Sequence, residues 1–314
     1  MTQGQLDLFN PLLTHPASAT RRQRGRRQRG RRRNELLEVM RVALIVSRRH
    51  LNDYSCPKSK HTFTQPQLLS CFILKTFKKL SYRGTSELLE ASDGLRAVLG
   101  LDEVVPAHTT LLEFSKRTLS PELIDTLVGE VLQLLQENGL VVKELAVDST
   151  GVETSSASAH FVSRCKRHRE GYVKLSMAVA CGSIVLVSLV ISMGPCNDLC
   201  EAPAVLWKAS GRCGPDWTLM DKGYDAERMH SFCAGWGATS YIPPVPKTQD
   251  GTIKSGAGRI RCANHRPYFA GKRWHVESFI SGMKRTCGST LAARSEAALK
   301  IEAGLKALAY AIRR

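Results

Sequence analysis

Three acidic residues stand out because of where they lie in the sequence. Asp148 directly follows an apolar Leu-Ala-Val, at the expected end of a first strand, and Asp221 closes the apolar run WTLMD of another expected strand. Glu277 lies within residues 271–285, whose apolar spacing predicts a helix. Taken singly, an acid after a strand is usually a turn residue, and a helical glutamate is usually solvated. Together the three could bind divalent cations, because Mg²⁺ and Mn²⁺ prefer carboxylate oxygens.

The helix that carries Glu277 predicts which kind of substrate such a site would take. At 100° per residue, Arg273, Glu277 and Lys284 fall within about 40° of one another, beside an apolar face that could dock on a sheet. The two cations, together with Lys222, could contact phosphates. Two metal ions about 4 Å apart can activate a water or hydroxyl and stabilise the leaving oxygen of a phosphodiester. We therefore expect Asp148, Asp221 and Glu277 to bind metal and catalyse phosphodiester cleavage.

The elements that must position these residues change in kind after Gly139. Residues 35–140 are rich in helix signals, whereas residues 144–152 read as a strand. A predicted hairpin follows, and then helices alternate with short strands up to a last helix over about 295–312. Between the strand at 238–244 and the helix that carries Glu277 we expect a loop of about 25 residues. This order predicts a mixed α/β sheet flanked by helices and preceded by an all-α region.

Capping signals set the expected starts of several helices in the first region. Ser120-Pro121-Glu122 places a cap, an N1 proline and an acid in order. Ser86 is expected to open a second helix, and the capping box from Thr110 to Glu113 a third. Short helices joined by tight turns suit a helix-turn-helix DNA-binding module and a plain helical bundle equally well.

The 19 uncharged residues 175–193 resemble a membrane span by hydropathy alone. Gly182-Ser183 breaks the run, and its second half is rich in Val and Ile, so we expect a hairpin buried on both faces. The N-terminus lacks the order of a secretory signal, and the ten cysteines include no CxxC pair. The spacing of Cys196, Cys200 and Cys213 matches no paired zinc pattern. We therefore expect a soluble intracellular protein with reduced thiols.

Positive charge is concentrated near the N-terminus. The chain of 314 residues has a formal charge of +17 and a pI near 9.7, and residues 21–33 alone carry +9 in a tandem RRQRG repeat. A segment with no apolar side chain cannot form a core, so we expect a disordered arm that is either a solvated tail or a binder of polyanions. The arginines predicted to bind DNA are Arg21, Arg22, Arg24, Arg26, Arg27, Arg29, Arg31, Arg32 and Arg33.

The motifs in their order resemble a known family. VDSTG (147–151), LMDKGYDAE (219–227) and the R-x3-E-x6-K spacing resemble the DDE transposases of bacterial insertion sequences. GPCNDLCEAP (194–203), SYIPP (240–244) and LGLDEVVPAHTTLLEF (99–114) resemble further family segments, so the resemblance covers about residues 60–314. The signature departs at Ala270, where the family has a tyrosine; the nearest tyrosine is Tyr268.

The resemblance implies an RNase H-like fold, with Asp148, Asp221 and Glu277 binding Mg²⁺ or Mn²⁺, two ions in all. It implies a transposase that binds inverted repeats in double-stranded DNA, cleaves element ends and transfers strands as a homodimer. It also implies a protein of the prokaryotic cytoplasm that is associated with the nucleoid. The expected parts are a disordered basic arm (1–34), a helical DNA-binding domain (35–140) and an RNase H-like DDE catalytic domain (141–314). An RNase H-like nuclease without strand transfer, and a non-catalytic DNA-binding relic, remain alternatives.

Overall fold

The computed structural model describes residues 34–58, 60–154, 172–246 and 251–314. The nine arginines of residues 21–33 therefore lie outside the described residues, and the predicted disorder of the arm stays a prediction. None of the described helices is long and apolar enough to cross a membrane.

The N-terminal region is helical, as predicted. Its helices are α2 (Glu35–His50), α3 (Gln65–Phe77), α4 (Tyr82–Glu90), α5 (Asp93–Leu99), α6 (His108–Thr118) and α7 (Pro121–Glu137). The predicted start of α7 is confirmed, since Ser120 caps the helix by accepting the backbone N–H of Leu123 at 3.1 Å.

Two predicted helix starts are wrong. The N-cap of α4 is Ser81, which accepts the N–H of Gly84, while Ser86 lies inside the helix and donates to the carbonyl of Pro106. Helix α6 begins at His108, so Thr110 is already helical and makes no capping box. In α4 an earlier serine takes the capping position, and in α6 the helix begins without a side-chain cap.

The sheet has the order β3-β2-β1-β4-β5. The strands are β1 (Glu144–Val152), β2 (Val173–Ala180), β3 (Val185–Met193), β4 (Trp217–Leu219) and β5 (Thr239–Tyr241). Strands β1, β2 and β3 are antiparallel neighbours, whereas β4 and β5 run parallel to β1. This is the predicted RNase H-like arrangement, and the apolar run 175–193 forms the β2–β3 hairpin, with every residue of β2 buried.

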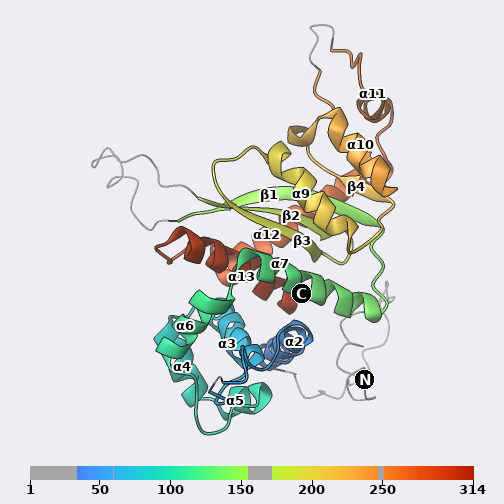
Figure 1. Cartoon of the computed structure of the whole chain (residues 1–314). Coiled ribbons are helices and arrows are strands. Elements are labelled where there is room, and N and C mark those ends of the chain that lie inside the picture. Colours follow the sequence, from blue (N-terminus) through green and yellow to red (C-terminus); the bar gives the residue numbers. More distant parts are fainter. Residues whose placement is uncertain (1–33, 59, 155–171, 247–250) are drawn as a thin grey trace, which may run out of the picture.

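Helices cover both faces of the sheet. The elements after β3 are α9 (Asp198–Ser210), η2 (Lys222–Tyr224), α10 (Glu227–Trp236), α11 (Ala257–Asn264), η3 (Tyr268–Arg273), α12 (Trp274–Cys287) and α13 (Glu296–Arg313). Helices α9 and α10 share one apolar cluster with the sheet, and α12 and α13 share a second one with its other face. Helices α7 and α13 lie between the sheet and helices α2–α6 (Figure 1).

Helix α11 and the short helix η3 lie where the sequence predicts a loop. Helix α11 is fixed by Asp225, whose carboxylate binds the Arg259 guanidinium at 2.8 and 2.9 Å. Glu227 accepts the backbone N–H groups of Gly258 and Arg259, two of the unpaired donors at the start of α11. The second apolar cluster also contains residues of α2 and α3, so helices and sheet share a continuous core. The boundaries of the three expected domains stay a prediction.

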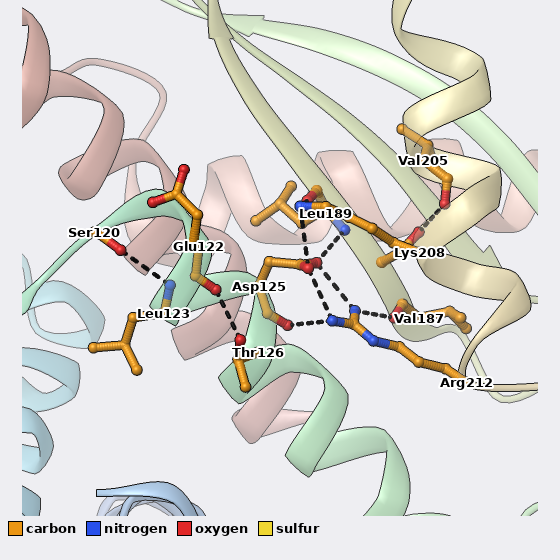
Figure 2. Close-up of polar contacts among 11 residues, drawn as sticks. Ser120, Glu122, Leu123, Asp125, Thr126, Val187, Leu189, Val205, Lys208 and Arg212 are labelled. Atoms are coloured by element: carbon orange, nitrogen blue, oxygen red, sulfur yellow. Dashed lines mark hydrogen bonds and ion pairs between the residues drawn. The ribbon is translucent and has the colours of Figure 1, made fainter.

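One buried carboxylate joins the helical region to the sheet (Figure 2). Asp125 of α7 accepts the backbone N–H of Leu189 in β3 at 2.9 Å and binds the guanidinium of Arg212 at 2.8 and 3.0 Å. The ammonium of Lys208 lies 3.1 Å from the same carboxylate. A Cβ at Gly129 would meet the Arg212 side chain at 3.0 Å, so glycine here lets the guanidinium lie against α7.

We expect Asp125→Ala to lower the free energy of unfolding by about 3 kcal/mol, because it removes the carboxylate that pairs with a largely buried guanidinium and leaves the Leu189 N–H without its acceptor. Gln133→Ala, on an exposed position of the same helix, is the control and should change it by less than about 0.5 kcal/mol. Urea unfolding of both variants measures the difference. A loss below about 1 kcal/mol for Asp125→Ala would show that the ion pair is dispensable.

Candidate active site of three carboxylates

Asp148 lies in the middle of β1 and not at its end. It pairs with Met177 of β2, and β1 continues to Val152. The prediction of a strand end is therefore wrong, because the polar Ser-Thr-Gly that follows Asp148 still pairs with β2. Side chains alternate along a strand, so Asp148 shares the sheet face of Ala146 and Val152, the face covered by α12.

Asp221 follows β4 by two residues. It caps the short helix η2, and its Oδ1 accepts the backbone N–H of Gly223 at 2.7 Å. A Cβ at Gly223 would lie 2.9 Å from that oxygen, which explains a glycine at this place. Strand β4 is parallel to β1 with Leu219 opposite Ala146, so a two-residue continuation of the register brings Asp221 level with Asp148.

Glu277 lies in the first turn of α12. The helix buries Val276, Phe279 and Met283, which leaves Glu277 on its exposed side, with 52% of the side chain accessible. Arg273, at the junction of η3 and α12, donates to Glu277 and also to Asp148 Oδ2 at 3.3 Å. The guanidinium of Arg273 therefore joins the acid of the strand to the acid of the helix.

Electrostatic coupling brings the third acid into the same group. Burial raises the pKa of Asp148 above its ordinary value, and the charges of Asp221 and Glu277 raise it further. The N–H of Ser149 and the charge of Arg273 act in the opposite direction. Asp148 therefore lies within reach of both other carboxylates, in a part of the protein that disfavours an unpaired negative charge.

The donor types of this group fit a hard divalent cation, which takes oxygen ligands. Among the described residues, however, no three His, Cys, Asp or Glu side chains are grouped closely enough to hold a metal ion. The cation that Asp148 and Glu277 share in this structure is the Arg273 guanidinium. A metal ion would take the place of that positive charge, so its binding requires Arg273 to turn away from the carboxylates.

We expect Asp148→Asn to stabilise the folded protein at neutral pH. A raised pKa means that folding disfavours the charged form, so the wild type loses stability as the pH rises from its ordinary pKa of 3.8 through the folded value. The asparagine variant lacks this loss, and its advantage should grow between pH 4 and pH 7. Denaturant unfolding at both pH values measures it; equal or lower stability of the variant at pH 7 would contradict the assigned cause.

The other residues predicted to contact DNA in the body of the protein lie on the elements that carry Asp221 and Glu277. Lys222 is exposed in η2, next to Asp221, and Lys284 lies half-buried in the last turn of α12. Trp274, 53% exposed, stacks on the His275 ring with centroids 4.2 Å apart. The position of the family tyrosine, Ala270, is buried and cannot reach a substrate.

Residues 245–270, predicted as a loop, contain a basic surface on α11 and η3 that sequence reasoning missed. Residues 251–276 contain no acid, while Arg266 and Tyr268 are exposed, Tyr268 by 94%. The Tyr268 ring packs edge-on against Phe269, which packs in the same way against Trp217, both with centroids 5.0 Å apart. The absence of acids over 26 residues was a signal that the sequence offered.

Comparison with known proteins gives a family for this chain. No curated protein shows significant sequence similarity to it. Among solved structures, the piggyBac transposase in a synaptic complex with hairpin DNA aligns with a TM-score of 0.41 and 10% identity, covering 89% of this chain and 72% of that one. The family model described as the transposase DDE domain matches residues 143–312, a range that contains Asp148, Asp221 and Glu277. The chain therefore belongs to the transposase family with a DDE domain.

Proposed function

We propose that this transposase cleaves DNA at the ends of its element and joins the freed ends to target DNA. The observation that carries the proposal is that Asp148, Asp221 and Glu277, all within the range of the family match, interact electrostatically at the face of the sheet that α12 covers, with Arg273 between Asp148 and Glu277. The family generally uses divalent metal ions, and we assign these three carboxylates as their ligands.

In this proposal each charged group has its own task. A bound Mg²⁺ or Mn²⁺ pair would activate the attacking water or 3′-hydroxyl and stabilise the leaving oxygen. The three carboxylates would hold that positive charge at the face of the sheet that α12 covers. Arg273, released from Asp148 and Glu277, is then free to bind a phosphate of the DNA with both of its terminal nitrogens, as Lys284 and Lys222 would with single contacts.

The distribution of charge favours a path for the DNA along the C-terminal part of the chain. Residues 251–314 contain 13 Lys and Arg but only three acids. The helical residues 35–140 contain 12 Lys and Arg and 13 acids. Binding to phosphates needs a surplus of positively charged side chains. We therefore place the main DNA contacts outside the N-terminal arm on α11, η3 and α12. The exposed ring of Tyr268 beside Arg266 suits stacking on an unpaired base. The predicted DNA-binding domain at 35–140 has no such surplus.

The test is an assay with the purified chain and labelled DNA that carries the inverted repeats flanking its own coding region. With Mg²⁺ present, we expect cleavage at the repeat ends and, with target DNA added, joined products. Nicks without joined products would favour a nuclease, and bound but uncut DNA would favour a DNA-binding relic. Two element ends must be held together for joining, so we also expect a dimer on DNA, measurable by light scattering of the complex.

A further inference from the structure

A buried polar cluster lies on the opposite face of β1 from Asp148. Lys174 of β2 is 3% exposed, and its ammonium lies 2.6 Å from Asp198 Oδ1 and 3.4 Å from Glu201 Oε2, both on α9. It also donates to the carbonyl of Cys196 at 2.6 Å. In the sequence, Lys174 is the charged residue that directly precedes the long uncharged run of the hairpin.

The register of the sheet brings the hydroxyl partners of this cluster together. Ser149 pairs with Ser176, and Lys174 pairs with Ser192, so these residues share one sheet face with the α9 carboxylates above them. Ser176 and Ser192 both donate to Glu201. Glu201 therefore fastens α9 to β2 and β3, away from the strand that bears Asp148.

Asp198 has a different connection, which leads to the candidate active site. It accepts the hydroxyl of Ser149, and the backbone N–H of the same Ser149 donates to Asp148 Oδ1 at 2.8 Å. Ser149 therefore connects the buried carboxylate of Asp198 to the candidate active site.

The Asp198 carboxylate is held charged in this arrangement. Burial favours its neutral form, but hydrogen bonds from Lys174 and Ser149 outweigh that and lower its pKa. The charges of Asp198 and Glu201 likewise outweigh burial and raise the pKa of Lys174. A charged acceptor fixed from behind gives the Ser149 hydroxyl a single orientation and a strong hydrogen bond.

We propose that Asp198 is a positioning residue, which, held by Lys174 and acting through Ser149, sets the orientation of the Asp148 carboxylate. Asp198 does not contact Asp148 directly, so its effect is to orient and not to bind. This inference rests on the proposed metal-binding role of Asp148.

Binding of Mn²⁺ to the full chain without DNA, measured by electron paramagnetic resonance, tests the proposal. Removing a partner that orients metal ligands typically weakens binding by about 10- to 100-fold, and we expect this for Asp198→Asn and Ser149→Ala. Ser149→Thr, which restores the hydroxyl, should recover most of the affinity. Ser192→Ala, in the same cluster but bonded only to Glu201, is the matched control and should stay within about twofold of the wild type.

The outcomes separate this inference from the proposed function. If Asp148→Asn abolishes Mn²⁺ binding while Ser149→Ala and Asp198→Asn bind like the wild type, the positioning role is overturned and the metal site stands. If Ser192→Ala weakens binding as much as Ser149→Ala, the cluster acts only by holding α9 in place, and the proposal is likewise overturned. If the wild type binds no Mn²⁺, or Asp148→Asn binds as well, the metal site itself fails. Thermal unfolding of each variant checks that the fold is retained.

Discussion

Asp148→Asn, Asp221→Asn and Glu277→Gln are each expected to lower the rate of strand cleavage at least about 100-fold, the usual cost of losing one charge-stabilising group in an active site. Each substitution keeps the shape of the side chain but removes a negative charge that the proposed metal site needs. Single-turnover cleavage of labelled element ends measures the rate. Binding of the same DNA should remain within a few-fold of the wild type, because the carboxylates do not contact phosphates.

Asp216→Asn is the matched control for these variants. Asp216 is an exposed acid one residue before β4, and its backbone, not its side chain, makes its recorded sheet contacts. We expect wild-type cleavage from it. If one of the three active-site variants retained wild-type cleavage, that residue would not be catalytic. Another side chain would then have to complete the proposed metal site.

Removal of residues 1–33 is expected to change DNA binding strongly and the cleavage chemistry little. In a plot of the logarithm of DNA affinity against the logarithm of salt concentration, nine arginines that neutralise phosphates would steepen the slope by up to about 8. Six to ten such contacts cost about 10³- to 10⁵-fold in affinity between 50 and 200 mM salt. The shortened chain should therefore bind more weakly at low salt and lose less affinity as salt is added. Titration of labelled DNA at several salt concentrations measures both slopes.

Two further measurements make the result specific to the arm. At protein concentrations that saturate the DNA, the shortened chain should cleave at the wild-type rate, since Asp148, Asp221 and Glu277 are unchanged. A chain with all nine arginines replaced by lysine should keep the full salt slope, because the slope depends on charge and not on guanidinium geometry. An unchanged affinity and slope after deletion would make the arm a solvated tail.

Several elements of the fold could be predicted from local sequence. The strand 144–152 and the β2–β3 hairpin follow from runs of apolar residues with a Gly-Ser break, and α7 follows from its Ser-Pro-Glu start. These signals lie within the elements themselves. Helix α11 could not be predicted in the same way, because its start depends on Asp225 and Glu227, some 30 residues away, which pair with Arg259 and the first N–H groups of the helix.

The candidate site divides along the same line. The sequence by itself determined the three acids, their order and the helical spacing of Arg273, Glu277 and Lys284, since residue type and helix period are local properties. Only the tertiary structure decided that Arg273 binds both Asp148 and Glu277, and that Ser149 faces Asp198 from the other side of β1. Those contacts depend on the register of β1 against its neighbours and on where α12 and α9 dock. Register and docking are set by burial summed over the whole core, which no short segment encodes.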